Sequence, residues 1–259
     1  MQIYWGTRTL DHLGKNPVVV IGNLDGVHRG HQALVARAQE RARALSGHVV
    51  VLTFTPHPAK VLAPALAPPL LCSEERKLDL LAALGVDACV VEPFTWELAA
   101  LAPEAFVTGV VRDALGAVEV VVGYDFTYGR ARGGTVTTLA VDGRRHGFAL
   151  HVIEPVTVDG LVASSTKIRE LLHEGDVRGA HLLLGRPFDV EGVVERGAGR
   201  GRAIGMPTAN VATQAELLPQ SGVYAARVTR LDAPGTAVVD DAVVNLGRNP
   251  TFVHNGELS

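Results

Sequence analysis

The sequence predicts an α/β fold with a parallel sheet, followed by a smaller module of antiparallel strands. Between Pro17 and Glu154, short β-branched runs alternate with segments whose apolar residues recur at helical spacing, which is typical of a parallel sheet covered by helices. After Gly185 the chain turns to short β-like runs separated by Gly, Pro, Asn and Asp clusters, which indicates a small barrel or sandwich. We place the boundary there, with residues 1–186 in the first domain and residues 187–259 in the second.

The strands of both domains stand out as short apolar runs. In the first domain they are Val18–Ile21, Val49–Phe54, Ala88–Val91, Val118–Val122 and Phe148–Ile153, and in the second Val190–Val194, Tyr224–Val228 and Ala242–Leu246. The run at Val118–Val122 is almost continuously apolar, as expected for a strand that is buried on both faces. The proline-rich segment Val61–Leu70 is expected to be an irregular surface loop.

Helices are expected between the strands, and capping residues mark several of their ends. The segment from Leu34 to Leu45 has one apolar face and stops near Gly47, which we expect to be its C-terminal cap. Ser73 begins a second helix that ends at Gly85. Further helices are expected from Pro103 to Gly116, from Thr135 to Arg145, from Ser164 onward and in a short segment ending near Gly185.

The composition favours a folded cytoplasmic protein that acts on small molecules. With 47% hydrophobic residues among 259, the chain can bury a sizeable core. Its apolar runs are far shorter than the ~20 residues that cross a membrane, and its N-terminus shows no secretory pattern. Neither Cys72 nor Cys89 lies in a metal or dithiol motif, so both are expected to be packing residues. The net charge of −3 gives no drive toward nucleic acid or membranes, and we expect a monomer or weak oligomer.

The segment Gly22–His31 is the most informative part of the sequence, because it joins the first strand to the first long helix. In open parallel sheets, ligands bind beyond the carboxyl ends of the strands, and a helix N-terminus offers free N–H groups to a phosphate. We therefore expect an ATP site that includes Gly22, Asn23, Asp25, Gly26 and Gly30. His28 and His31 flank a glycine and can both donate hydrogen bonds to one phosphate as charge develops during transfer. The alternative is an ordinary glycine-rich turn with two solvated histidines.

The run His28-Arg29-Gly30-His31 resembles the HxGH motif of Rossmann-like nucleotidyltransferases, which transfer AMP from ATP and release pyrophosphate. The segment lacks the phosphate-loop pattern of ordinary kinases and the glycine spacing of nicotinamide dehydrogenases, so both are disfavoured for this domain. The motif alone leaves several acceptors open, including phosphopantetheine, nicotinate mononucleotide, glycerol phosphate and flavins. A catalytic carboxylate, Asp125, is expected at the end of the strongly apolar fourth strand, although it could instead cap a turn.

Three later segments narrow the choice of acceptor. Thr53–Pro58, Gly123–Gly129 and Ser164–Arg169 resemble, in order and separation, the FMN-adenylylating half of the bacterial bifunctional riboflavin kinase/FAD synthetase. The resemblance covers nearly all of residues 1–186. One departure is Leu24, where the family usually has Phe, and we expect altered packing with retained chemistry.

The resemblance implies roles for these segments that agree with their chemistry. Pro56, His57, Asp125 and Phe126 are expected to bind the flavin, with Pro56 stiffening the loop that presents His57. Ser164, Ser165 and Thr166 offer hydroxyls and free N–H groups to ATP at a second helix N-terminus, and Arg169 adds a catalytic cation. The alternative is that Ser165 is only a helix cap, with Lys167 and Arg169 on a solvated face.

The reaction that the resemblance implies is a direct transfer. An FMN phosphate oxygen attacks the α-phosphorus of Mg-ATP, His28, His31 and Arg169 stabilise the developing charge, and pyrophosphate leaves. The expected cofactor is Mg²⁺, with ATP as co-substrate and riboflavin, FMN and FAD as substrates and products. A non-catalytic nucleotide or flavin sensor that keeps the binding loops is the alternative from another functional class.

The second domain contains a glycine-rich segment that can wrap phosphates. Its expected phosphate loop comprises Gly197, Gly201, Arg202, Gly205 and Pro207. Thr208 and Asn210 follow with oxygen donors that suit Mg²⁺. A plain hairpin loop is the alternative reading of the segment alone. Together with Gly222–Ala225 and Asn245–Phe252, however, it resembles the flavokinase half of the same bifunctional enzyme, an antiparallel barrel that phosphorylates riboflavin with MgATP.

The position of the last residue, Ser259, leads to a further expectation. In the flavokinase family a glutamate general base lies on a strand beyond the Asn-Pro-Thr-Phe segment, and Glu257 lies too early to match it. We therefore expect the barrel to be partial and the sequence to belong to a longer chain that has both activities, because an open barrel edge exposes apolar faces. Should the native polypeptide end at Ser259, the kinase assignment would be withdrawn.

Overall fold

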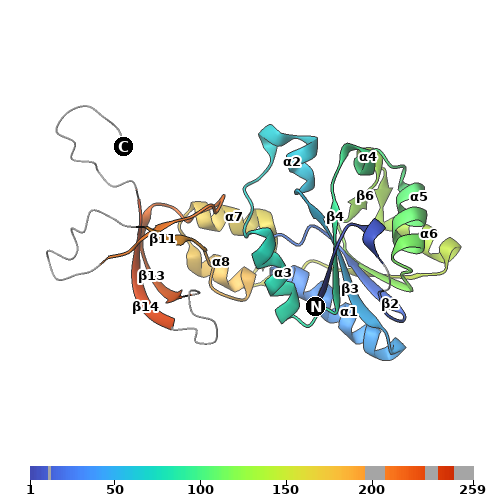
Figure 1. Ribbon diagram of the computed structural model, residues 1–259, viewed down its shortest axis with the longest axis horizontal. Helices are drawn as coiled ribbons and strands as arrows, with labels where there is room; N and C mark the ends of the chain where they lie inside the picture. The colour runs from blue at the N-terminus through green and yellow to red at the C-terminus, as the bar shows by residue number, and fades with distance from the viewer. Residues whose placement is uncertain (11–12, 196–207, 231–238, 248–259) are drawn as a thin grey trace.

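A six-stranded parallel sheet forms the centre of the computed structural model, which describes residues 1–10, 13–195, 208–230 and 239–247 (Figure 1). The strands lie in the order β1-β4-β3-β2-β5-β8, and every neighbouring pair is parallel. Their bounds are β1 Gln2–Trp5, β2 Pro17–Ile21, β3 His48–Thr55, β4 Ala88–Pro93, β5 Glu119–Gly123 and β8 Ala149–Ile153. The predicted α/β fold with a parallel sheet is thereby confirmed.

The sequence analysis missed strand β1 but found the other five. β1 pairs only with β4, beginning with Gln2 opposite Ala88, and its four residues are mostly exposed. A strand with so little buried surface lacks the alternation or continuous apolar run by which strands are recognised in a sequence. Its place at the edge of the sheet follows from tertiary pairing.

Helices cover both faces of the sheet. Consecutive residues of β2 point to opposite faces, so Val18 and Val20 join one core cluster while Val19 and Ile21 join the other. The first cluster packs against α1 Arg29–Leu45 and α3 Glu74–Ala83, and the second against α5 Pro103–Phe106, the π-helix η3 Val107–Ala114 and α6 Val136–His146. The helix expected from Pro103 to Gly116 is thus an α-helical turn followed by a π-helical one.

Two local predictions were wrong. The Val61–Leu70 segment is not wholly irregular, because α2 Pro58–Leu62 and a 3₁₀ turn at Pro64–Leu66 occupy part of it. Helix α2 forms because the ring nitrogen of His57 accepts from Ala59 N at 3.2 Å and proline starts the helix. Gly47 is not in a left-handed cap conformation at the end of α1; Ser46 is, with φ of 49°.

Several smaller elements complete the first domain. They are the 3₁₀ turns η1 Thr7–Thr9 and η4 Arg130–Arg132, helix α4 Trp96–Ala99 and the strand pairs β6 Thr127–Tyr128 with β7 Gly134–Thr135 and β9 Thr157–Val158 with β10 Leu161–Val162. Cys89 packs in the core, as expected, whereas Cys72 is only partly buried; burial raises the pKa of Cys72 to about 11 and that of Cys89 to about 12.

Helices α7 Ser165–His173 and α8 Val177–Leu184 lie between the sheet and the β-rich part of the chain (Figure 1). They share a third core cluster with Leu71, which precedes α3, and with Leu217 from the second domain. The side chain of Leu217 is only 3% exposed. Segments far apart in the sequence therefore meet on this helix pair.

The second domain consists of antiparallel strand pairs in the part that the structure describes. β11 Val193–Glu195 pairs with β12 Asn210–Ala212, and β13 Gly222–Thr229 pairs with β14 Val239–Leu246. Antiparallel pairing agrees with the prediction, but the described strands form two separate two-stranded sheets and do not close a barrel. The first strand also begins later than the expected Val190, because residues 190–192 are not paired.

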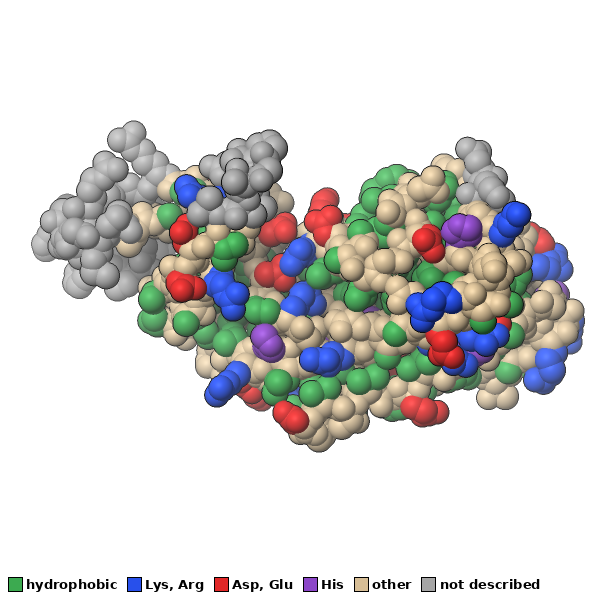
Figure 2. Space-filling model, turned by 90° about the horizontal axis from the view of Figure 1, so that it is seen from below, with side chains coloured by type: hydrophobic (Ala, Val, Ile, Leu, Met, Phe, Trp, Pro, Cys, Tyr) green, Lys and Arg blue, Asp and Glu red, His purple; other side chains and the backbone are tan. Residues whose placement is uncertain are grey.

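The surface carries both signs of charge. On the face shown in Figure 2, basic and acidic side chains are interspersed, in keeping with a net charge of only −3. Among the described residues, no helix combines the length and the apolar character needed to span a bilayer.

Candidate active site

The topology of the sheet brings the predicted site segments to one edge. From β2 the chain proceeds to β3 and β4 on one side and then returns to β5 on the other, so the strand order reverses between β2 and β5. Ligands of open α/β sheets bind at such a switch point, beyond the carboxyl ends of the strands. The segments that follow β2, β3 and β5 are those that contain Gly22–His31, Pro56-His57 and Asp125.

The turn after β2 is held in an unusual backbone conformation. Leu24, Gly26 and Val27 all have positive φ, at 52°, 78° and 42°. A Cβ atom on Gly26 would lie 2.7 Å from the Leu71 side chain, so this position requires glycine for both conformation and space. Leu24 is 1% exposed and belongs to the core cluster under α1, which agrees with the expected packing role of this residue.

His28 and His31 stand at the start of α1 with their rings stacked, 3.6 Å between centroids. Burial, followed by the charges of Arg169 and Arg186, lowers the pKa of His28 to about 4. Burial also holds the pKa of His31 well below its usual value, and both imidazoles are therefore neutral at pH 7. Each Nδ1 is buried and has no hydrogen-bond partner among the described residues. Two unsatisfied ring nitrogens at a helix N-terminus are suited to a ligand, and the alternative of two solvated histidines is wrong.

The start of α7 contacts the same turn. Ser165 Oγ donates to the backbone oxygen of Asp25 at 3.0 Å, and a Cβ on Gly30 would lie 3.1 Å from the backbone oxygen of Ala163. Ser164, and not Ser165, is the helix cap, because its hydroxyl accepts from Lys167 N. Thr166 is exposed on the first turn of α7. Two helix N-termini thus meet beside Gly22–His31.

Arg169 is buried and paired with Asp25. Its Nη2 donates to Asp25 Oδ2 at 2.5 Å and its Nε donates to Pro69 O at 2.7 Å. The Asp25 carboxylate also accepts from Leu71 N at 3.0 Å. Burial raises the pKa of Asp25, although the Arg169 charge opposes the shift. The alternative that places Arg169 on a solvated face is wrong, and its Nη1 has no partner within the described part of the chain.

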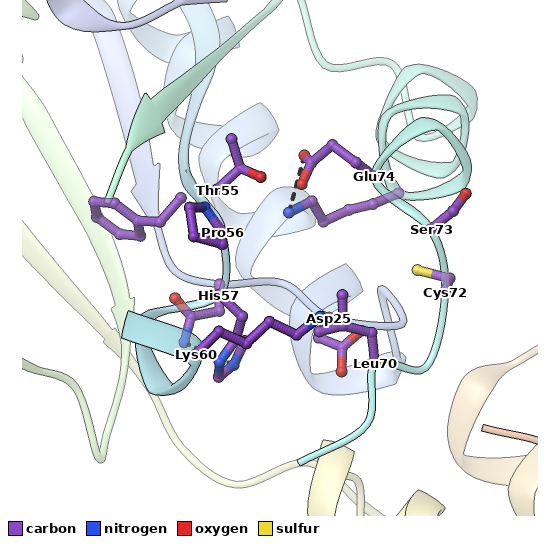
Figure 3. A pocket seen from close by; sticks show the side chains of 12 residues that line it. Asp25, Thr55, Pro56, His57, Lys60, Leu70, Cys72, Ser73 and Glu74 are labelled. Atoms are coloured by element: carbon purple, nitrogen blue, oxygen red, sulfur yellow. Dashed lines mark hydrogen bonds and ion pairs between the residues drawn. The ribbon is translucent and has the colours of Figure 1, made fainter. Parts of the chain in front are cut away.

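A small cavity of about 130 Å³ opens beside this pair, where β3 meets α2 and α3 (Figure 3). Pro56 and His57 form part of its wall, and Asn23 and Asp25 connect it to the turn after β2. His57 Nε2 lies 3.5 Å from Asn23 Nδ2. Burial, followed by the charges of Arg169, Lys77 and Lys60, lowers the pKa of His57 to about 4, so this ring is neutral as well.

Asp125 and Phe126 lie outside this cavity, on the turn after β5. Phe126 N donates to Gly123 O at 3.1 Å, and the Phe126 ring stacks on Tyr128 with 5.7 Å between centroids. Asp125 is exposed. The structure therefore brings Pro56 and His57 together at the cavity beyond β3 and places the other two predicted flavin residues beyond β5, on the other side of β2.

Two cavity residues were missed in the sequence analysis. Lys77 is buried on the inner face of α3, next to Leu78 and one turn before Leu81, and Glu74 pairs with it across 3.1 Å. The apolar periodicity of this segment places Lys77 on the buried face of the helix, and a lysine at such a position could have indicated a functional site. Arg186 was also missed; it donates to the backbone oxygen of Gly26 at 2.9 Å from just beyond α8.

The predicted phosphate loop of the second domain, Gly197, Gly201, Arg202, Gly205 and Pro207, lies outside the described residues. Thr208 and Asn210 are described, and both are exposed. Asn210 is the first residue of β12, opposite Glu195, and Thr208 lies two residues before it. Their oxygen atoms fit a hard cation held mainly by phosphate and water. Among the described residues, no cluster of three His, Cys, Asp or Glu side chains forms a metal site.

The fold and the site together define a class of protein: an α/β nucleotide-binding protein with an HxGH turn at its switch point. The family model described as FAD synthetase matches residues 11–167, and the one described as riboflavin kinase matches residues 184–259. The chain belongs to the family of bifunctional riboflavin kinase/FMN adenylyltransferases.

Individual relatives agree with this assignment. Proteins with that name from Pseudomonas fluorescens and Escherichia coli K12 are each 37% identical to the chain, over 99% and 94% of its length and 81% and 78% of theirs. The relative from Listeria monocytogenes is 39% identical over 82% of the chain and 68% of its own length. A crystal structure from Streptococcus pneumoniae, described as a macrolide-efflux protein, superposes with a TM-score of 0.82 at 28% identity, covering 97% of this chain and 81% of that one.

Proposed function

We propose that the chain is a bifunctional enzyme of FAD biosynthesis, which adenylylates FMN in its first domain and phosphorylates riboflavin in its second. The domains correspond to residues 1–186 and 187–259. The observation that carries the first activity is the meeting of two helix N-termini, those of α1 and α7, beside the stacked His28 and His31. The second activity is supported by the riboflavin kinase match over residues 184–259.

ATP is proposed to lie against the turn after β2 and the first turn of α7. The backbone of Gly22, Asn23, Asp25, Gly26 and Gly30 would line its phosphates, and Ser164, Ser165 and Thr166 would face them from α7. Free N–H groups at the two helix starts attract the phosphates electrostatically. Because His28 and His31 are neutral, each ring can donate one hydrogen bond without repelling the nearby Arg169 and Arg186 charges.

The proposed chemical step is an in-line transfer. A phosphate oxygen of FMN attacks the α-phosphorus of ATP, a new P–O bond forms, and the bond between the α-phosphorus and the bridging oxygen breaks to release pyrophosphate. Donors fixed in a buried site stabilise the charge that develops on the α-phosphate oxygens, and their removal typically costs about 10²–10³ in rate. His28, His31 and the unpaired Nη1 of Arg169 are the proposed donors, and Asp25 holds Arg169 in place. Asp125 is proposed to act on the flavin side.

Flavin is proposed to bind along the carboxyl ends of β3 and β5. Pro56 and His57 supply the wall of the cavity beside β3, and Asp125 and Phe126 supply the rim beside β5. β3 and β5 lie on either side of β2. A ligand that contacts the ends of both strands must therefore pass over the turn after β2, which carries His28 and His31.

For the kinase reaction we propose that Thr208 and Asn210 hold Mg²⁺ together with the phosphates of ATP, while the preceding glycine-rich segment wraps the nucleotide. The cation neutralises phosphate charge. The partners are proposed to be small molecules only, and the protein a cytoplasmic monomer or weak oligomer.

Chromatography of the products formed from FMN plus MgATP, and from riboflavin plus MgATP, tests the proposal. We expect FAD and pyrophosphate in equal amounts from the first mixture, and FMN together with FAD made from it from the second. Pyrophosphate release with nicotinate mononucleotide or phosphopantetheine but not with FMN would overturn the flavin assignment. No turnover with any acceptor would indicate a sensor.

A variant of His31 separates the two proposed activities. His31→Ala should lower the rate of FAD formation by about 10²–10³ and leave FMN formation from riboflavin unchanged. His48→Ala is the matched control, because His48 is an exposed histidine at the opposite end of β3. Equal rates in wild type and His31→Ala would contradict the role of the turn.

A further inference from the structure

The cavity beside β3 contains an acceptor and a donor that the protein itself does not satisfy. Glu74 Oε1 is buried and makes no hydrogen bond within the described part of the chain, although Lys77 Nζ lies 3.1 Å away. The two charges are close but not aligned as a hydrogen bond. The only hydrogen bond of the Lys77 ammonium among the described residues is a long one of 3.3 Å to Thr53 Oγ1. An ammonium can donate three hydrogen bonds, so Lys77 can still donate to a ligand.

Buried polar groups are costly to leave without hydrogen-bond partners. The position of Glu74 and Lys77 is set by α3, which packs Leu78 and Leu81 against the sheet and is capped by Ser73. Figure 3 shows Glu74 extending from α3 toward Thr55 and Pro56 on the opposite wall. The pair therefore faces the cavity.

The charges of the cavity exclude one class of ligand. Lys77 is balanced by Glu74, Lys60 by Glu216 at the rim, and Asp25 by Arg169. A phosphate would face two carboxylates, those of Glu74 and Asp25, with no surplus of positive charge to hold it. The cavity suits a neutral group that donates one hydrogen bond and accepts another.

Its size and walls restrict the ligand further. A pocket that encloses a whole drug-sized molecule measures roughly 300–1,000 Å³, so about 130 Å³ holds only one end of a substrate. Phe54, Pro56 and Leu70 give the wall an apolar character, whereas Glu74 and Lys77 are polar. The matching group is a largely apolar substrate end whose edge carries one donor and one acceptor.

We infer that this cavity binds the pyrimidinedione edge of the flavin, with the imide N–H donating to Glu74 and an adjacent carbonyl accepting from Lys77. This inference rests on the proposed flavin function and assigns a specific contact to it. Glu74 and Lys77 then select an unsubstituted flavin imide, while the phosphate end extends toward the turn that carries His28 and His31. Adenine, which also presents a donor beside an acceptor, is the competing occupant.

The test compares FMN with FMN methylated at the imide nitrogen, in FAD formation by the whole protein. A hydrogen bond to a charged group corresponds to about a tenfold to hundredfold difference in affinity. We expect wild type to show a kcat/KM for N3-methyl-FMN lower by this factor, mainly through KM. Glu74→Ala should reduce activity with FMN and abolish the preference between the two flavins. The exposed neighbour Glu75 supplies the control: Glu75→Ala should retain the full preference.

Each outcome decides the question. Equal use of FMN and N3-methyl-FMN by wild type would overturn the inference without any variant being needed. A preference that survives in Glu74→Ala would also overturn it. If Glu74→Ala instead removes discrimination against N6,N6-dimethyl-ATP, the cavity holds adenine and the inference is wrong. Absence of FAD formation from FMN in wild type would contradict the proposed function itself, which is a different failure.

Discussion

Loss of the buried ion pair between Asp25 and Arg169 should strongly destabilise the protein. Asp25 is 6% exposed and Arg169 is 9% exposed, and the two lie 144 residues apart in the sequence. Removal of one partner from such a buried ion pair destabilises a protein by about 3–5 kcal/mol, because the other charge is left without compensation. Arg169→Met should therefore lower the melting temperature by roughly 6–20 °C, at about 2–4 °C per kcal/mol for a protein of this size.

The loss of stability in Arg169→Met should be smaller at low pH, where Asp25 is protonated. Burial already raises the pKa of Asp25, and Arg169 is the largest influence that lowers it. In Arg169→Met the pKa of Asp25 rises further above its value in the unfolded chain. Stability that depends on a raised pKa is present at low pH and lost as pH rises through the folded-state pKa, so the variant recovers toward wild type when Asp25 is protonated.

Urea unfolding of wild type and Arg169→Met at pH 7 and at pH 4 measures this difference. The double variant Asp25→Asn/Arg169→Met is the control, since it has no unpaired carboxylate and should be more stable at pH 7 than Arg169→Met alone. A loss below about 1 kcal/mol in the single variant, with no change between the two pH values, would show that the pair behaves as a solvated surface contact and would refute the reasoning.

Three further outcomes are expected. Wild type should lose stability as pH falls from 6.5 toward 4, because the unfolded chain binds a proton at His28 that the folded one does not; His28→Gln should lose less in the same urea titration, and identical profiles would contradict the lowered pKa. Gly26→Ala should destabilise by about 1–3 kcal/mol and slow FAD formation, since its Cβ meets Leu71 at 2.7 Å and its φ is 78°; Gly160→Ala, also at positive φ but with open space around it, separates the contact from the strain. Leu217→Ala should cost about 2–5 kcal/mol by thermal melting, against near-neutral change in the exposed Leu218→Ala.

Local patterns were sufficient for much of the fold and for one half of the site. The five strands of the sheet other than β1, and the starts of α3, α6 and α7, follow from apolar runs and capping residues that act within a few positions of one another. The turn after β2 was found for the same reason, since glycines and histidines at a strand-to-helix junction are a short-range feature. Where these local signals were weak, as in the exposed strand β1, the prediction failed.

The cavity residues illustrate why the rest could not be found in this way. The sequence shows Lys77 as a charged residue on an otherwise apolar helix face. Its place in the cavity, however, depends on its contacts with Thr53 and Glu74, which only the folded structure brings together. The role of Arg169 was expected to be that of a free cation, whereas its Nη2 and Nε are bound to Asp25 and Pro69. No spacing in the sequence specifies which carboxylate a distant arginine will meet.

The sequence by itself determined the α/β class, the position of the nucleotide turn and the resemblance that leads to a flavin acceptor. These depend on periodicity, capping and motif spacing, each of which is a free-energy preference of neighbouring residues. Only the tertiary structure decided that α7 would meet the turn after β2, that Arg169 would pair with Asp25, and that Glu74 and Lys77 would face a cavity. Those contacts join residues on different strands and helices, and they are fixed by the strand order and by the cost of leaving buried charges unpaired.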